Sequence, residues 1–216
     1  MPKTNNTPCI FDCETTARPL TELESMIPVF EANKTYKDPE KIAADLAKKK
    51  AEWLDSAALS AQTGQIVIIG TRRDGVTEFL EGDEKHMLET FWRMWSESHP
   101  ATFIGHNCFN FDVPFLMRRA WMLGVTVPAG VMDGRGRYLS DRWADTMAVW
   151  SCGSRQSEAG SSSLDAIAKA LTGKGKSGNG KDFAALYKAD KAAALSYLDN
   201  DLQLTESVAK KMGMIV

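Results

Sequence analysis

The sequence predicts an α/β domain in which a central β-sheet is covered by α-helices. Three observations support this prediction. Short apolar runs alternate along the chain with longer segments of helical periodicity. The length of 216 residues suits one domain, expected to span residues 1–216. Hydrophobic residues make up 44% and charged residues 25%, which excludes a mainly disordered chain, a collagen-like repeat and a bare coiled coil.

The N-terminal half is expected to contain three strands and two helices. The strands are short apolar runs and the helices are amphipathic segments; in chain order they are strand 9–13, helix 39–59, strand 65–72, strand 76–80 and helix 84–98. The dipeptide Asp74-Gly75 is typical of a hairpin turn, so the second and third strands should pair antiparallel. Residues 15–39 contain prolines and mixed charge, and an irregular excursion is expected there.

The C-terminal half is expected to contain two more strands and three helices. By the same criteria these are strand 102–105, helix 113–123, strand 142–150, helix 164–171 and a long helix over 182–212, broken once. Residues 128–141 should form a loop, as should the glycine-rich segment 173–181. The lysines of this second loop either contact nucleic-acid phosphates or are simply solvated, and the sequence does not decide between these alternatives.

The charge balance limits the kinds of partner that the surface as a whole can attract. Lys and Arg number 26 and Asp and Glu 28, which gives a formal net charge of -2. This balance argues against a basic coat protein or a general DNA-compacting protein, but it does not report local patches.

The cysteines and the N-terminus indicate the compartment. The 4 cysteines include no C-x-x-C pair, so neither a zinc ribbon nor a thioredoxin-like motif is expected. We expect instead that the cysteines are reduced, buried thiols in a cytoplasmic protein. The first residues contain no apolar leader, and the longest apolar run, at 66–70, is too short to span a membrane. A membrane partner is therefore not expected.

Two carboxylates end the first predicted strand. Asp12 and Glu14 are two residues apart, so on a strand their side chains point to the same face. Two neighbouring carboxylates repel each other unless a cation lies between them or one holds a proton. The alternative is a pair of solvated acids at a strand end.

Three further residues repeat this pattern of polar groups beside apolar elements. Asp112 follows the strand at 102–105, where it is either a ligand or the N-cap of the next helix. Tyr197 and Asp201 are four residues apart on the last helix and therefore share one face. Asp201 falls at the border of the apolar arc of that helix, where a carboxylate needs a partner.

Together these residues predict a metal site. Hard oxygen ligands such as the four carboxylates of Asp12, Glu14, Asp112 and Asp201 suit Mg²⁺ or Mn²⁺. Two such ions about 4 Å apart can activate a water and stabilise the leaving oxygen of a phosphodiester. A tyrosine such as Tyr197 can orient that water or help to deprotonate it.

Three segments resemble the exonuclease motifs of the DnaQ-like, RNase H-fold 3′–5′ exonucleases. FDCET is similar to the first motif, GHNCFNFD to the second in the form seen in family-B polymerase proofreading domains, and YLDND to the third. The third motif has the Tyr-x-x-x-Asp form of the DEDDy branch, since Ser196 stands where the histidine branch has its histidine. The resemblance spans residues 8 to 212, and it implies an RNase H-like mixed β-sheet flanked by helices.

The resemblance also implies roles for individual residues. The metal ligands implied are Asp12, Glu14, Asp112 and Asp201, which with the water-positioning Tyr197 form the catalytic set. The residues implied to line the 3′-terminal nucleotide are Thr15, His106, Asn107 and Phe111. Asp145 matches an Asp-Thr often found on a late strand, where we expect a supporting role.

The function implied is that of a two-metal 3′–5′ exonuclease using Mg²⁺ or Mn²⁺. It would release nucleoside 5′-monophosphates from DNA 3′ ends, with single-stranded or frayed ends preferred. The alternatives are a 3′–5′ exoribonuclease on the same fold and a catalytically silent nucleic-acid-binding module. Association with a replication or repair polymerase in trans is left open.

The segment 36–70 is similar to stand-alone exonucleases of phages and prophages, which implies the cytoplasm of a bacterial or phage-infected cell. Residues 16–61 exceed what a minimal proofreading domain needs. They are expected to form an insert between the first and second strands, with no role assigned.

Overall fold

The computed structural model describes residues 7–154, 161–176 and 183–215. A five-stranded sheet forms its centre, with strand order β3-β2-β1-β4-β5. The strands are β1 (Cys9–Ala17), β2 (Gly64–Arg73), β3 (Val76–Glu81), β4 (Phe103–Gly105) and β5 (Trp143–Asp145). β1 pairs antiparallel with β2 and parallel with β4, so the sheet is mixed and the predicted fold class is confirmed.

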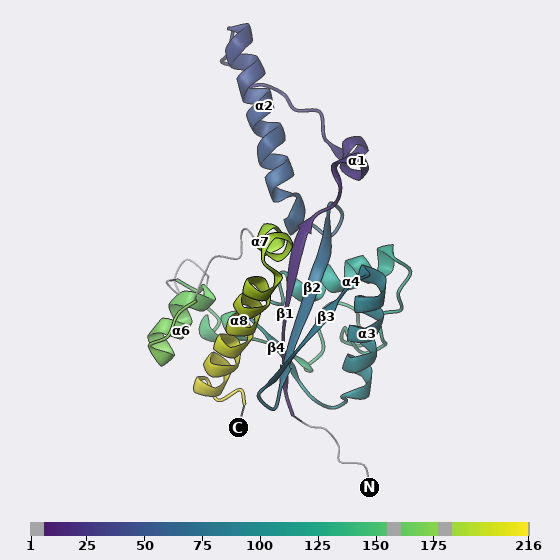
Figure 1. The fold of residues 1–216 in the computed structure, drawn as a ribbon, viewed down its shortest axis with the longest axis vertical. Coiled ribbons are helices and arrows are strands. Elements are labelled where there is room, and N and C mark those ends of the chain that lie inside the picture. Colours follow the sequence, from purple (N-terminus) through teal and green to yellow (C-terminus); the bar gives the residue numbers. More distant parts are fainter. Residues whose placement is uncertain (1–6, 155–160, 177–182, 216) are drawn as a thin grey trace.

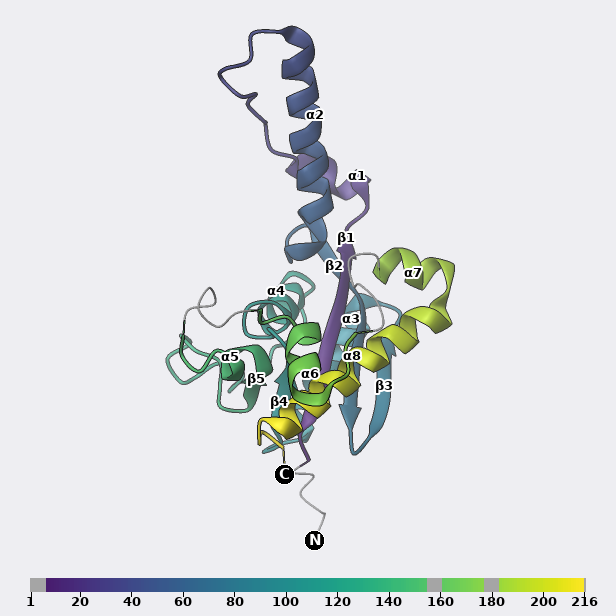
Figure 2. The ribbon, with the colours of Figure 1, turned by 90° about the vertical axis from the view of Figure 1, so that its left-hand side faces the viewer.

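Helices cover both faces of this sheet (Figures 1 and 2). One face packs against α7 (Phe183–Ala189) and α8 (Lys191–Lys211), with α6 (Leu164–Thr172) resting on α8. The other face packs against α3 (Glu84–Glu97) and α4 (Asp112–Met122). The sheet is thus the middle of three layers, and residues on β1 face α8 or α3 and α4 in alternation.

The alternation along β1 decides which side chains reach which layer. Phe11 and Cys13 lie in the apolar cluster with α3 and α4, whereas Ile10 packs with α7 and α8. Because side chains on a strand alternate between faces, Asp12 and Glu14 share the α8 side with Ile10. The strand therefore aims both carboxylates at the helix that carries the third motif.

A glycine on β2 lets that helix come close. Gly70 pairs with Asp12 across the sheet. A Cβ built on Gly70 would lie 2.8 Å from a methyl carbon of Leu202 and 3.0 Å from one of Leu198. The missing side chain allows α8 to pack directly over β2 at the level of Asp12.

The structure corrects the end of one predicted strand and locates the break in the last helix. The expected strand over 142–150 is wrong beyond Asp145, because α5 (Thr146–Trp150) begins there. The cause is capping: the Asp145 carboxylate accepts hydrogen bonds from the backbone N–H groups of Met147 and Ala148 at 2.8 and 3.3 Å. The expected single break in the last helix is confirmed, and it lies at Asp190, the N-cap of α8.

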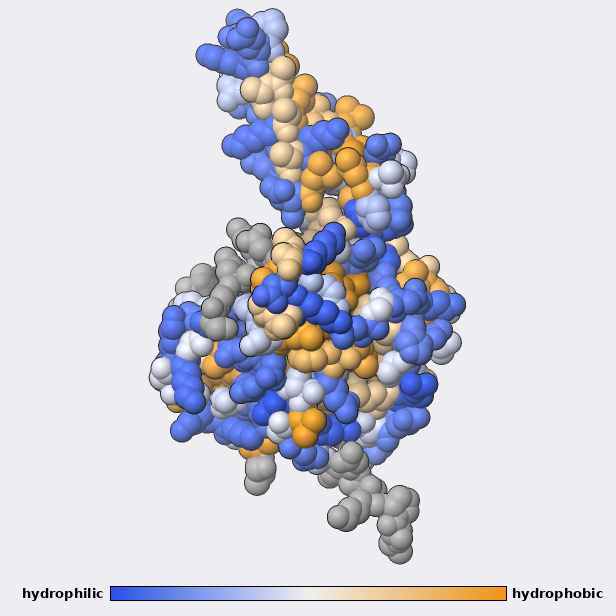
Figure 3. Space-filling model, in the orientation of Figure 1, coloured by the Kyte–Doolittle hydropathy of each residue, from blue (hydrophilic) through white to orange (hydrophobic). Residues whose placement is uncertain are grey.

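The segment between β1 and β2 projects from the body as an arm, defined here as residues 18–63 (Figures 1 and 3). Its elements are α1 (Leu20–Leu23), η1 (Glu24–Met26), α2 (Pro39–Ser56) and η2 (Ala57–Leu59). The helix expected over 39–59 is present, with its last three residues in a 3₁₀ turn. The expected irregular excursion starts later than predicted, because β1 continues to Ala17.

The remaining expectations concern thiols, loops and membranes. Cys9, Cys13 and Cys108 are free and buried as predicted, whereas Cys152 is free but exposed. Of the loop expected at 173–181, residues 173–176 are described and 177–181 lie outside the described residues. Within the described part of the chain, no helix is long and apolar enough to cross a membrane.

Candidate metal centre and active site

Three carboxylates from distant parts of the chain meet beside β1. One carboxylate oxygen from each of Asp12, Glu14 and Asp201 lies within 4.8 Å of the other two. Asp12 and Glu14 come from β1, and Asp201 comes from the middle of α8. The sheet alternation and the close packing of α8 at Gly70 account for this meeting.

Asp112 joins the cluster from the opposite side of β1. It is the first residue of α4, and its Oδ1 accepts a hydrogen bond from the backbone N–H of Cys13 at 3.0 Å. The helix-cap alternative is not what the structure shows, because the N-cap position belongs to Phe111 and makes no side-chain cap bond. The Asp112 carboxylate is instead fixed to the strand that carries Asp12 and Glu14.

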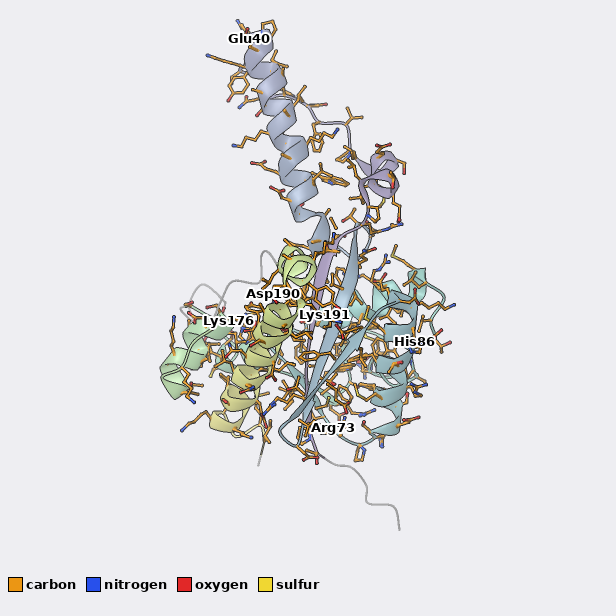
Figure 4. The ribbon with its side chains drawn as sticks, in the orientation of Figure 1. Glu40, Arg73, His86, Lys176, Asp190 and Lys191 are labelled. Atoms are coloured by element: carbon orange, nitrogen blue, oxygen red, sulfur yellow. The ribbon has the colours of Figure 1, made fainter. Side chains whose placement is uncertain are left out.

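A lysine side chain enters the cluster from the segment after α6. The Lys176 Nζ lies 2.5 Å from Oδ2 of Asp201 and 3.4 Å from the Tyr197 hydroxyl oxygen. Figure 4 shows Lys176 in the region between α6 and α8. The other oxygen of Asp201, Oδ1, is buried and has no hydrogen-bond partner among the described residues.

Burial disfavours the ionised forms of Asp12, Glu14 and Asp112, and repulsion by neighbouring carboxylates adds to this for Asp12 and Glu14. Removal from water is the largest cause in each case, and it raises the pKa of Glu14 to about 8 and that of Asp112 to about 6. The pKa of Asp12 is well above its usual range because of burial and then of the neighbouring Asp112 and Glu14 carboxylates. A divalent cation would relieve both effects, and the orphaned Asp201 oxygen and the all-oxygen donor set fit such an ion.

These pKa directions predict how the metal-free protein responds to pH. A carboxyl group whose pKa is raised by folding stabilises the protein below its unfolded pKa and loses that contribution as the pH rises. For Glu14 the loss runs from its ordinary value of 4.5 up to about 8. We therefore expect the thermal unfolding midpoint in EDTA to decrease as the pH is raised from 5 to 8. Addition of Mg²⁺ should reverse this decrease.

Thermal unfolding with and without Mg²⁺ measures this dependence. The lowered pKa of buried His106 acts in the opposite direction, but it adds stability only over the lower part of this range. Glu14→Gln should flatten the fall because its amide does not titrate. An unfolding midpoint in EDTA that rises steadily from pH 5 to pH 8 would contradict the prediction.

The predicted nucleotide-contacting residues line the same cavity of about 400 Å³ as the acids. They are Thr15, His106, Asn107 and Phe111. The Thr15 hydroxyl donates to the carbonyl oxygen of Ala58 at 2.8 Å, and His106 Nδ1 lies 2.9 Å from the Thr146 hydroxyl. The sequence-predicted site residues are therefore brought together around one cavity.

The turn that carries His106 and Asn107 is held by Asp145. Its carboxylate accepts hydrogen bonds from the backbone N–H groups of Asn107 and Phe109 at 2.9 and 3.0 Å. Asn107 has a φ of 59°, a left-handed conformation that asparagine tolerates better than most residues. Asp145 therefore supports the site by fixing the backbone that leads to Asp112, as expected.

Sequence reasoning missed two contributions to the cavity. Lys176 was placed in a basic loop without any link to the carboxylates. The base of the arm also lines the cavity, through Asp55, Ala58 and Leu59. The i, i+4 spacing of Asp55 and Leu59 at the end of an amphipathic helix was visible, but nothing in it indicated contact with the first motif.

Comparisons with known proteins show what the sequence and the fold resemble. The family model of the exonuclease domain of family-B DNA polymerases matches residues 43–145, a range that includes Asp112. Among solved structures, the family B DNA polymerase from the hyperthermophilic archaeon Pyrobaculum calidifontis is similar with a TM-score of 0.61 and 16% sequence identity. The match covers 95% of this chain and 24% of the polymerase chain. No curated protein matches the chain.

These findings bear on fold and on activity to different degrees. At this identity the structural likeness shows the fold, which spans about a quarter of the polymerase. The family match supports a nuclease. Together they confirm the predicted resemblance to the DnaQ-like exonucleases.

Proposed function

We propose that this chain, similar to the DnaQ-like exonucleases in motif order and in fold, is a metal-dependent 3′–5′ exonuclease acting on DNA. The products would be nucleoside 5′-monophosphates. The observation that carries the proposal is the meeting of Asp12, Glu14 and Asp201 within 4.8 Å in a cavity that also holds Tyr197. The resemblance to a polymerase domain favours single-stranded or frayed 3′ ends as substrate, in the context of a polymerase in trans.

The acids would hold two divalent ions, Mg²⁺ or Mn²⁺. Asp12, Glu14 and Asp201 are close enough to share one ion, and Asp112, whose carboxylate is held by the backbone N–H of Cys13 next to Asp12, can contribute to a second. Bound ions of this kind supply activation of a water molecule and neutralisation of the charge that develops on the phosphate.

Tyr197 is expected to position the attacking water rather than to deprotonate it. Burial, followed by the nearby Asp201 carboxylate, raises the pKa of its hydroxyl above the ordinary value, so the phenol keeps its proton at neutral pH. A protonated phenol both donates and accepts hydrogen bonds, which lets it hold a water in a fixed direction. The ring is 7% exposed, which fixes its orientation.

The cavity is also suited to a terminal nucleotide. Phe111 lines it with an apolar ring on which a base can stack. Thr15, His106 and Asn107 surround the same space and offer polar groups to the sugar and phosphate. Because the body and the base of the arm both border the cavity, a strand end fits more readily than the middle of a duplex.

Digestion of a 5′-labelled single strand tests the proposal. We expect a ladder that shortens from the 3′ end in Mg²⁺ or Mn²⁺ and no digestion in EDTA. A matched RNA strand, digested in parallel, distinguishes the exoribonuclease. Retained binding of 3′ ends without any hydrolysis in either metal would replace the proposal by a silent binding module.

A further inference from the structure

The arm has more surface than its own packing explains. α2 has 18 residues and buries none of them. Its contacts are mainly with the chain that returns beside it: the Asp45 carboxylate accepts from the backbone N–H of Asn33 at 2.9 Å, and Lys49 Nζ donates to the Glu31 carbonyl at 2.7 Å. A helix that adds so little to the core leaves its exposed face open to a partner.

One face of α2 runs from the far end of the arm to the catalytic cavity. Lys41, Lys48 and Asp55 recur at seven-residue spacing, and each step of seven drifts by only about 20° on a helix. All three are exposed, and Asp55 lines the cavity that contains Asp12 and Tyr197. Figure 4 places Glu40, next to Lys41, at the end of the arm farthest from the sheet.

The outer part of this face is a shallow groove. It is lined by Tyr36, Lys41, Ala44, Asp45 and Lys48. Within the described residues Lys41 makes no ion pair, and Lys48 has only a 3.7 Å contact with Glu52, both side chains being more than 60% exposed. Asp45 is already paired with Lys49 at 3.0 Å, so the charge offered to solvent in the groove is positive.

The local charge differs from that of the whole chain. Residues 34–50 carry six lysines and three acidic residues, whereas the chain as a whole has a net charge of -2. Tyr36 is 40% exposed and lines the groove together with Lys41 and Lys48. Lysines beside an exposed aromatic ring are the combination that binds a single strand, through its phosphates and by stacking on a base.

We propose that this arm groove, defined by Tyr36, Lys41 and Lys48, binds the single-stranded segment of a nucleic-acid substrate upstream of its 3′ end. The inference rests on the proposed function, which places the 3′ end in the cavity at Asp55. The fourteen residue steps from Lys41 to Asp55 rise about 21 Å, which a stacked strand spans with about six nucleotides. The arm therefore makes affinity depend on the length of the strand.

Fluorescence anisotropy in EDTA tests the proposal without requiring hydrolysis. The probes are a labelled deoxytrinucleotide and a labelled single strand of about 15 nucleotides. Lys41→Glu/Lys48→Glu should weaken binding of the longer strand about tenfold and lower the salt slope of its affinity by about 1.4, since each phosphate contact contributes about 0.7. Tyr36→Ala should weaken binding at every salt concentration without changing the slope.

The matched control is Lys50→Glu/Lys85→Glu, which changes the net charge equally. Lys50 lies on the opposite face of α2, and Lys85 lies on α3. The control should leave the affinity and the slope as in the wild type, and the trinucleotide should bind equally to all variants. Equal losses in the control would overturn the proposal in favour of non-specific charge attraction, and no loss in the arm variant would overturn it in favour of a protein partner for the arm. Failure of the exonuclease proposal would appear separately, as binding without digestion in Mg²⁺.

Discussion

Asp12→Asn is expected to lower the rate of DNA digestion on the order of a thousandfold while making the metal-free protein more stable. The loss of rate follows from the central place of Asp12, which lies within reach of Glu14 and Asp201 and beside Asp112. The gain in stability follows from its raised pKa: at neutral pH the unfolded chain holds Asp12 ionised, and folding must either protonate it or bury its charge beside three neighbouring acids. A neutral amide of the same shape removes that repulsion.

The two effects are measured separately on the same sample. Single-turnover digestion of a labelled strand in Mg²⁺ gives the rate, and urea unfolding in EDTA at pH 8 gives the free energy of unfolding. Asp199→Asn serves as the control for the rate. It makes the same change two residues from Asp201 on α8, where the Asp199 carboxylate accepts from Gln203 at 2.8 Å and not from the cluster. Digestion by Asp12→Asn at the wild-type rate would contradict the metal-dependent mechanism.

An acid that is needed for activity but lowers the stability of the metal-free protein stands out in a sequence. An ordinary fold gains nothing from Asp12 and Glu14 on one face of a strand that also carries Ile10, so their presence indicated a ligand. Tyr197 and Asp201 were readable for the same reason, since a helix of known period fixes their common face. Local periodicity was sufficient to predict which side chains of these four residues share a face, but not their roles.

Asp112 was harder, because an acid at the start of a helix is equally explained by capping. The deciding contact, the hydrogen bond from the backbone of Cys13, joins residues 99 positions apart. No pattern within a short segment reports such a contact. The ordered set of motifs favoured the ligand role at this position.

The arm and β5 are two further places where the pattern of a short segment did not predict the structure fully. The period of residues 39–59 predicted a helix, but not that it would leave the body, because packing partners are not encoded in the period. At 142–150 the β-prone residues suggested a strand, and the capping bonds of Asp145 ended it after three residues. In the arm the period left the packing partner open, and at β5 a local capping preference overruled the β-propensity of the residues after Asp145.

Lys176→Met is expected to have the reverse effects of Asp12→Asn: a less stable metal-free protein and at least tenfold tighter binding of Mn²⁺. The Lys176 ammonium lies 2.5 Å from Asp201 Oδ2 and supplies positive charge to a cluster of acids. Without it the carboxylates repel one another more strongly, which destabilises the fold. A unit charge about 4 Å away contributes about 4 kcal/mol at an effective dielectric constant near 20, enough to shift a cation affinity by a factor of ten or more.

Calorimetric titration with Mn²⁺ in the absence of DNA measures the affinity, and thermal unfolding in EDTA measures the stability. Lys169→Met is the control, because Lys169 is 61% exposed on its side chain and pairs with Asp165 instead of the cluster. Unchanged or weaker Mn²⁺ binding in Lys176→Met would show that the ammonium and the cation do not compete.

Asp12→Asn and Lys176→Met are expected to change stability and cation affinity in opposite directions, and a folding defect does not produce this pattern. A damaged fold lowers both stability and cation binding. The charge argument instead requires that removing a negative group stabilises the metal-free protein and weakens cation binding, and that removing the positive group does the opposite. Because Asp12 and Lys176 act on the same Asp201 and Glu14 carboxylates, the double variant should fall between the single variants in both quantities.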